Sequence, residues 1–263
     1  MNLVAEASGD HGISSRRVRT TETEFRTTTL KIGKRVPILL FDRSDNEAAE
    51  QYRLLRTNIR LHPAAPKVIA ISSAMPRDGK TVTAINTSAI LALKEDSRVL
   101  LVDGDLRQQG VARTLGLQTE FGLSDLICRK CTSADAIVVT EQIPNLHVLT
   151  AGTVAENPAE LLDSDSFRSL ISTFKAQFSY IVFDTTPITA VADFKLVQQV
   201  CDGFILVVRP DSTNRSEFLN SLEIEHREKL LGVVVNAFRK WFLFRHPGGY
   251  YYRNRGSQAA AGR

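Results

Sequence analysis

Cysteine is scarce in this sequence. The 263 residues include only Cys128, Cys131 and Cys201, too few for the disulfide framework that holds small secreted domains together. Cys128 and Cys131 have CxxC spacing, but a structural zinc site needs four ligands and no second pair of ligands is apparent. We therefore expect ordinary cysteines and neither a disulfide scaffold nor a zinc domain.

Long hydrophobic runs are also missing. No stretch reaches the roughly 18 uninterrupted apolar residues that a membrane-spanning helix needs. The first residues include Glu6 and Asp10 and lack the apolar segment of a secretory signal. Hydrophobic residues still make up 43% of the chain, which is enough for a sizeable core. These features predict a globular protein of the cytoplasm.

Acidic residues are absent from one end of the chain. Residues 239–263 hold six basic residues and no acidic one, and residues 1–36 hold seven basic and four acidic residues. The net charge of +4 therefore belongs to the two ends, and the middle is acidic. Such ends are either solvated tails or segments attracted to an anionic membrane surface or acidic partner. No nucleic-acid-binding module is visible, so nucleic acid is not an expected partner.

Three regions differ in composition. Residues 1–36 lack periodicity and are predicted to be disordered, residues 37–238 form the predicted domain, and residues 239–263 form a basic tail containing tyrosines. Within the domain, short apolar runs alternate with helical stretches, which indicates an α/β fold with a doubly wound, mostly parallel sheet. We predict strands at 68–72, 99–103, 146–150, 180–184, 203–208 and 232–236, and helices at 46–61, 80–94, 164–177, 190–200 and 215–229.

The first predicted strand leads into a phosphate-binding loop. Positions 73–81 are Ser-Ala-Met-Pro-Arg-Asp-Gly-Lys-Thr, which matches the P-loop pattern GxxxxGK[ST] except that Ala74 replaces the first glycine. Backbone N–H groups at a helix start bind phosphate oxygens, Lys80 can neutralise the β- and γ-phosphates, and Thr81 can bind Mg²⁺. The candidate nucleotide-binding residues are Ala74, Met75, Pro76, Arg77, Asp78, Gly79, Lys80, Thr81 and Val82.

Carboxylates follow two further strands. Asp103 and Asp105 leave one strand at positions i and i+2, and Asp184 ends another. Because the carboxyl ends of parallel strands share one edge of a sheet, we expect all three near Lys80. An exposed Asp-Gly-Asp turn is the simpler alternative for the first two. A bound Mg²⁺, or a proton to accept, would explain why a buried strand ends in carboxylates.

These motifs resemble the bacterial tyrosine kinases of capsule and exopolysaccharide synthesis, a branch of the MinD-like (SIMIBI) P-loop proteins with a deviant Walker A loop. VLLVDGDLR at 99–107 matches the family pattern hhhDxDxR. YIVFDTTPI at 180–188 matches its Walker B motif, with Thr186 where the family usually has proline, and NPAELL at 157–162 is a further landmark. The resemblance runs from about Glu50 to Asn236.

Two features outside the nucleotide motifs add to the resemblance. The family has an ExxRxxR helix that it uses for self-association, and Glu50, Arg53 and Arg56 match it. The family also has a tyrosine-rich C-terminal tail, and three tyrosines lie near this terminus: Tyr250, Tyr251 and Tyr252.

The resemblance implies roles, cofactors and partners. Asp103 would accept the proton of an incoming tyrosine hydroxyl, Arg107 would stabilise phosphate charge or orient Asp103, Lys80 would hold the phosphates, and Asn236 would contact adenine. The implied cofactors are ATP and Mg²⁺, with Thr81 and Asp105 as ligands of Mg²⁺ and Asp184 binding the ion directly or through water. The implied assembly is a ring-like homo-oligomer that phosphorylates tail tyrosines of neighbouring subunits and other protein substrates. A separate membrane activator, the chain-length regulator of polysaccharide export, would hold it at the inner face of the membrane.

Two other functions stay open. A partition or septum-positioning ATPase would use the same site, but its signature lysine early in the P-loop is absent from Ser73-Ala74-Met75, and it does not explain the tyrosines. A non-catalytic, nucleotide-dependent scaffold for polysaccharide assembly would keep the whole ATP site. Phosphate on the tail tyrosines after incubation with Mg·ATP separates a kinase from both.

Overall fold

The computed structural model describes residues 25–32, 38, 47–189, 192–223 and 226–237. The basic tail with Tyr250, Tyr251 and Tyr252 lies outside these residues, as does most of the N-terminal segment that we expected to be disordered. Residues 25–32 of that segment are an exception and correct the expectation, because Arg26–Thr28 forms strand β1.

The elements alternate as the sequence predicts. The strands are β1 (Arg26–Thr28), β2 (Val68–Ser73), β3 (Val99–Asp103), β4 (Ile137–Thr140), β5 (Leu146–Leu149), β6 (Tyr180–Asp184), β7 (Gly203–Val208) and β8 (Leu230–Val235). The helices are α1 (Glu47–Leu61), α2 (Lys80–Ala92), α3 (Gly110–Leu115), α4 (Leu123–Ile127), α5 (Ser133–Ala136), α6 (Pro158–Leu162), α7 (Asp165–Gln177), α8 (Asp193–Val200) and α9 (Arg215–Leu222), followed by a 3₁₀ turn, Arg227–Lys229.

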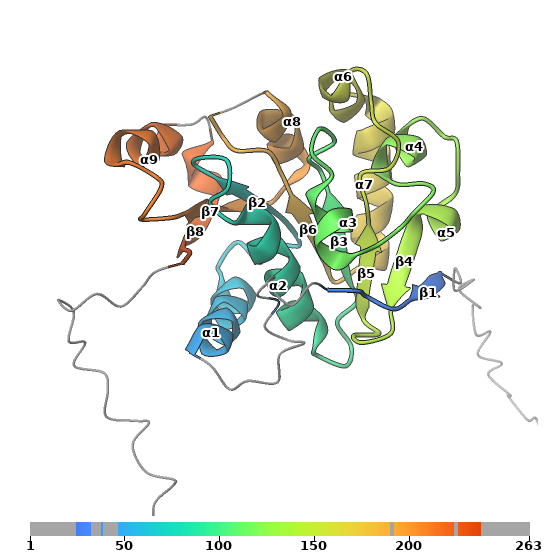
Figure 1. Cartoon of the computed structure of the whole chain (residues 1–263), viewed down its shortest axis with the longest axis horizontal. Coiled ribbons are helices and arrows are strands. Elements are labelled where there is room, and N and C mark those ends of the chain that lie inside the picture. The colour runs from blue at the N-terminus through green and yellow to red at the C-terminus, as the bar shows by residue number, and fades with distance from the viewer. Residues whose placement is uncertain (1–24, 33–37, 39–46, 190–191, 224–225, 238–263) are drawn as a thin grey trace, which may run out of the picture.

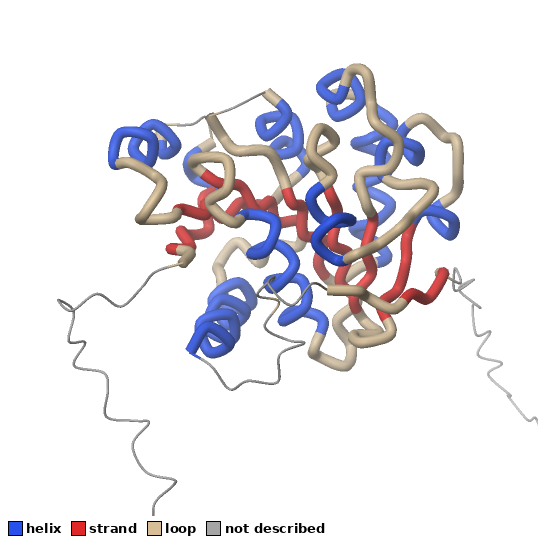
Figure 2. Tube along the Cα trace, in the orientation of Figure 1, coloured by secondary structure: helices blue, strands red, loops and turns tan. Residues whose placement is uncertain are grey.

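All eight strands belong to one sheet in the order β1-β4-β5-β3-β6-β2-β7-β8 (Figure 1). Every neighbouring pair is parallel except β4 and β5. Figure 2 shows the strands as a central layer with helices on both sides. The doubly wound, mostly parallel fold is therefore confirmed.

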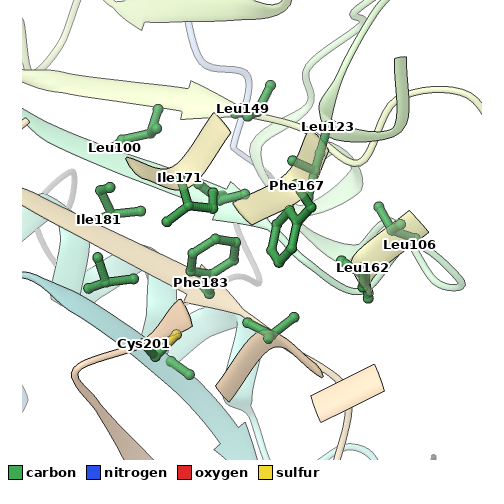
Figure 3. Close-up of a cluster of buried hydrophobic side chains, with 14 of the residues drawn as sticks. Leu100, Leu106, Leu123, Leu149, Leu162, Phe167, Ile171, Ile181, Phe183 and Cys201 are labelled. Atoms are coloured by element: carbon green, nitrogen blue, oxygen red, sulfur yellow. The ribbon is translucent and has the colours of Figure 1, made fainter. Parts of the chain in front are cut away.

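Each central strand is buried on both faces, which is why its sequence is a continuous apolar run. Alternate residues of a strand belong to two separate cores on the two faces of the sheet: Ala70 lies in one and Ile71 in the other. In the first core, Phe167 and Ile171 of α7 pack against Leu100 and Phe183 of the strands (Figure 3). The second core lies under α1 and α2. Packing on both faces holds the strand ends that carry the P-loop and the carboxylates.

Two strands, β1 and β4, were not predicted from the sequence. β4 is only four residues long, and β1 has three residues, of which Arg26 and Thr27 are exposed, so neither gives a strong apolar pattern. β1 is held by tertiary contacts: it pairs with β4, and Phe25 beside it packs edge-on against His147, with ring centroids 5.2 Å apart. Burial lowers the pKa of His147 to about 4, so this ring stays neutral under ordinary conditions.

One predicted helix is shorter than expected. The stretch 215–229 was expected to be a single helix, but α9 ends at Leu222. A 3₁₀ turn follows only at Arg227–Lys229, where His226 before it has a left-handed φ of 63°. A residue in that conformation cannot continue a right-handed helix.

We expect Asp202 to anchor the strand that carries the P-loop. Its carboxylate accepts hydrogen bonds from the backbone N–H groups of Lys67 and Val68, at 2.9 and 2.8 Å, and from Lys175 at 3.1 Å. Asp202→Ala leaves these donors without an acceptor and should lower the free energy of unfolding by about 2 kcal/mol. Urea denaturation measures this, with Glu120→Ala, an exposed acid, as the control.

The same hydrogen bonds predict an acid response. Although burial opposes them, they lower the pKa of Asp202 in the folded protein. The contribution of Asp202 to the free energy of unfolding is therefore complete above the pKa of the unfolded chain, about 4, and is lost as pH falls through the lower pKa of the folded protein. The difference in stability between wild type and Asp202→Ala should therefore shrink at the most acidic pH. A difference that stays constant down to about pH 2 would contradict the assigned ionic role.

Candidate active site

The P-loop continues directly from β2. Ala74 N–H donates to Val207 O at 3.2 Å, and Ala74 O accepts from Thr189 at 2.9 Å. The loop's left-handed residues are Arg77, with φ 69°, and Gly79, with φ 101°. Ala74 is not among the residues with positive φ, so an alanine fits where the P-loop pattern has glycine. Met75 packs against the core, and Pro76 and Arg77 are exposed.

Asp78 braces the loop. It is fully buried, its Oδ2 accepts from Met75 N–H at 2.9 Å, and its Oδ1 accepts from Ser212 and Thr213 at 3.0 and 2.8 Å. We expected Asp78 among the nucleotide-binding residues. The structure instead commits its side chain to tying the P-loop to the segment after β7, which leaves only its backbone to face phosphate.

Asn236 lies over the same loop. Its Nδ2 donates to Asp78 O at 2.7 Å, and a Cβ on Gly79 would lie 2.0 Å from that nitrogen. Gly79 is therefore required both by its φ and by this close approach. The expected adenine contact of Asn236 stays a prediction, and the contact that the structure shows is with the P-loop backbone.

Lys80 and Thr81 begin α2 and meet two carboxylates. Lys80 Nζ lies 3.0 Å from Asp105 Oδ2 and 3.9 Å from Asp184 Oδ1, and Thr81 donates to Asp184 Oδ2 at 2.7 Å. Burial alone would lower the pKa of Lys80, but Asp184 and Asp105 outweigh it and the pKa is raised. Burial raises the pKa of Asp184 to about 6. The expected convergence of strand ends is thus present.

Asp103 lies beside Asp184 in the register of β3 and β6. It is fully buried and accepts from Val111 N–H at 3.0 Å and more weakly from Asp105 N–H at 3.3 Å. Burial and the neighbouring Asp184 raise its pKa well above the usual range. A carboxylate with a raised pKa has the proton affinity that a base needs.

Arg107 forms an ion pair with Asp193 in the structure. Its Nε and Nη2 donate to the two carboxylate oxygens of Asp193, at 2.7 and 3.1 Å. Asp193 opens α8 and is buried. This fork joins the loop after β3 to the helix after β6. Sequence reasoning missed Asp193 because nothing local marks an acid in the first turn of a helix as the partner of a residue 86 positions away.

Thr186 occupies the turn where the resembled family has proline. Its carbonyl accepts from Ser72 at 2.6 Å, and the neighbouring Thr185 hydroxyl donates to Ile71 O at 2.9 Å. These two bonds tie the turn to β2. The turn is therefore held by side-chain hydrogen bonds and does not need the rigid ring of proline.

The residues present fit a magnesium ion. Asp103, Asp105 and Asp184 bring three carboxylates to one lysine, and Asp184 Oδ1 is buried without a hydrogen-bond partner in the described part of the chain. No group of three or more His, Cys, Asp or Glu side chains forms a metal cage among the described residues. Mg²⁺ is commonly held by one or two carboxylates together with substrate phosphates, and Thr81 adds a hydroxyl here.

The predicted self-association residues are not part of this site. Glu50, Arg53 and Arg56 lie on α1, which packs on α2. Glu50 and Arg53 form an ion pair with each other on its surface. Val82, the last candidate of the P-loop, lies in the first turn of α2 and is half-buried.

The left-handed conformation of Arg77 predicts that glycine is more stable than alanine at this position, the reverse of their order inside a helix. An L-residue with a left-handed φ is strained by about 1 kcal/mol, and glycine is not. Arg77→Gly should therefore be more stable than Arg77→Ala by about 1 kcal/mol, although both lose the same charge. Chemical denaturation of the two variants measures the difference.

The control for this comparison is Arg113, an exposed residue of α3. There the order should invert, because glycine costs about 1 kcal/mol relative to alanine inside a helix. The same order at both positions would rule out backbone strain at Arg77.

Comparison with known proteins agrees with this geometry. A family model described as an AAA domain matches residues 66–213. Tyrosine-protein kinase YwqD of Bacillus subtilis is 34% identical over 208 residues, which is 78% of this chain and 86% of the relative. Tyrosine-protein kinase CpsD of Streptococcus pneumoniae is 35% identical over 193 residues, or 72% and 84% of the two chains. Tyrosine-protein kinase ptk of Acinetobacter johnsonii is 33% identical over 88% of this chain, which spans 31% of that longer protein.

Solved structures extend the comparison to the fold. The chimerical protein CapA2B2 superposes with a TM-score of 0.74 at 32% identity, over 80% of this chain and 94% of its own. The kinase domain of Escherichia coli tyrosine kinase ETK gives 0.72 at 27% identity, over 88% and 89%. The septum site-determining protein MinD of Pyrococcus horikoshii gives 0.54 at 23% identity over 64% of this chain and 69% of its own, and so shares the fold. With its P-loop, its paired aspartates and this degree of identity, the chain belongs to the bacterial tyrosine-protein kinases of the P-loop class.

Proposed function

We propose that this kinase uses Mg·ATP to phosphorylate tyrosines of its own C-terminal tail, Tyr250, Tyr251 and Tyr252, in neighbouring subunits. One observation carries the proposal: the ends of β2, β3 and β6 bring Lys80, Asp105 and Asp184 together in a chain that belongs to the tyrosine-protein kinases. The tail tyrosines lie outside the described residues, so their role rests on the sequence.

The residues divide the work in a definite way. Lys80 and the N–H groups of the P-loop hold the phosphates. Thr81, Asp105 and Asp184 would hold Mg²⁺, which supplies neutralisation of phosphate charge when bound. Asp103 accepts the proton of the tyrosine hydroxyl, whose pKa in water is about 10. Arg107 is paired with Asp193 in this structure, so we assign it the positioning of the β3 loop that carries Asp105.

The assembly and cellular role extend the proposal. We assign the kinase to exopolysaccharide and capsule synthesis, as a homo-oligomer bound at the inner membrane face through a separate membrane activator. None of the described helices is long and apolar enough to cross a membrane. A partition-type ATPase and a non-catalytic scaffold remain the alternatives. The phosphorylation measurements below distinguish a kinase from these alternatives.

The division between base and metal ligand predicts different losses. Asp103→Asn should leave Mg·ATP binding unchanged and slow phosphotransfer by about 10²–10⁴-fold, the usual contribution of a general base. Asp105→Asn and Lys80→Met should weaken Mg·ATP binding and phosphotransfer together. Single-turnover assays with labelled ATP, combined with calorimetric titration of nucleotide, separate the two outcomes.

Stability supplies the control for misfolding. Asp103 has a raised pKa because its charge is unfavourable in the folded state. Asp103→Asn removes this charge but also replaces one of the two oxygens that accept backbone N–H groups, so the melting temperature of the protein at pH 7 should change little while activity falls. A variant that loses nucleotide binding or melts earlier would show that Asp103 has a structural role instead.

The tail proposal predicts where phosphate accumulates. Changing Tyr250, Tyr251 and Tyr252 to Phe keeps the aromatic bulk and removes the acceptor hydroxyls. Autophosphorylation should collapse, and binding of Mg·ATP should be unchanged because the P-loop is untouched. Peptide mapping after incubation with Mg·ATP measures this. Full phosphorylation of the variant, mapped to Tyr52 or Tyr180, would assign the acceptor to the domain instead.

The assembly proposal predicts a change of mass. Arg53→Ala with Arg56→Ala should yield a monomer that binds Mg·ATP and phosphorylates itself poorly, because a tail reaches a neighbour's site only within an oligomer. Each phosphate adds about −1.5 to −2 charges, which should weaken the docking of a tail in the acidic site of a neighbouring subunit. The phosphorylated wild type should therefore also dissociate. Light scattering on phosphorylated and dephosphorylated samples tests this, and one identical mass for all samples would contradict it.

A further inference from the structure

A second site lies at the opposite edge of the sheet from the P-loop. A cavity of about 460 Å³ opens at the amino ends of β2 and β6, where Lys67 and Tyr180 line it and Ile181 N–H donates to Lys67 O at 2.8 Å. The last turn of α1, the end of α2 and the end of α7 form its walls. Ligand cavities commonly measure about 300–1,000 Å³, so this one has room for a small ligand.

The cavity is basic. Its lining contains Arg56, Arg60, Lys67 and Lys94 against a single acid, Asp96. Among the described residues, no carboxylate lies within ion-pair distance of Arg56, Arg60 or Lys94. Water screens the mutual repulsion of Arg60, Lys67 and Lys94, which are exposed, but the excess of three positive charges still makes the cavity attractive to an anion.

Helix ends account for part of this pattern. Cations are favoured near helix C-termini, which suits Arg60 in the last turn of α1 and Lys94 just after α2. Lys67 Nζ donates to Lys175 O near the end of α7 at 3.2 Å. Arg56 does not fit this explanation, since it lies more than a turn before the end of α1, and its buried Nε has no hydrogen-bond partner in the described chain. That nitrogen lacks an acceptor.

The remaining lining describes the rest of the ligand. Among the apolar residues of the lining, Ile59, Leu91 and Phe178 are buried and Tyr180 is half-buried, so Tyr180 supplies the accessible aromatic surface. Arginine forks match phosphate oxygens in geometry, and an excess of three charges suits a dianion better than a single carboxylate. The cavity is therefore complementary to a phosphoryl group attached to a ring.

We propose that this basic cavity, lined by Arg56, Arg60, Lys67 and Lys94, is a binding site for an aryl phosphate. This rests on the proposed function for the identity of the ligand, because the product of a tyrosine kinase, phosphotyrosine, is an aryl phosphate. The phosphoryl group lies among the arginines, and the ring lies against Tyr180. The site connects the product of the reaction to α1, the helix with the predicted self-association residues.

The experiment uses phenyl phosphate as the probe, with the full chain saturated with Mg·ADP so that the P-loop is occupied. Isothermal titration should show binding of phenyl phosphate, weaker binding of inorganic phosphate and none of phenol. Arg60→Ala with Lys94→Ala should weaken binding by at least about tenfold, the effect of losing a charge-assisted hydrogen bond. Arg113→Ala with Arg227→Ala removes two exposed charges outside the cavity and should bind normally.

Three outcomes would overturn the proposal. These are no binding of phenyl phosphate, an equal loss of affinity in the control pair, and a cavity filled by acidic side chains of a second copy. In the last case phenyl phosphate fails to bind and Arg60→Ala with Lys94→Ala lowers the oligomer mass. The titration needs no kinase activity. If phenyl phosphate binds but the chain forms no phosphotyrosine from Mg·ATP, the cavity stands and the proposed function fails.

Discussion

Three carboxylates share one lysine at the carboxyl edge of this sheet, and the site depends on that imbalance. Asp103 and Asp184 are neighbours in the register of β3 and β6, and both have raised pKa values because they are buried near other acids. One Lys80 cannot neutralise three carboxylates. The buried carboxylates are therefore held together at an electrostatic cost, which a divalent cation would relieve.

The fold holds this cluster by bracing the loops around it. Asp78 ties the P-loop to the segment after β7, and Asn236 at the end of β8 holds it from above. Arg107 and Asp193 join the loop after β3 to α8. Each brace connects segments far apart in the sequence. Segments after β7 and β8 thus contribute to the geometry of the P-loop.

Features of the sequence that repeat locally were predictable, and features that depend on tertiary contact were not. The apolar runs before Asp103 and Asp184 identified β3 and β6, and parallel topology then placed their ends together. The side-chain role of Asp78 was not predicted, because the motif does not reveal Ser212 and Thr213 as its partners. β1 was missed because its order comes from β4 and from Phe25 packing on His147, and no pattern within residues 25–32 records either contact.

The most direct test of this account is intact-mass and peptide analysis of the dephosphorylated protein after incubation with ATP, with Mg²⁺ or with EDTA. If the three carboxylates and Lys80 form a magnesium-dependent phosphotransfer site, phosphate should appear on tyrosine with Mg²⁺ and be absent with EDTA. Hydrolysis of ATP to ADP and inorganic phosphate without any phosphotyrosine would contradict the account, and would assign the site to an ATPase.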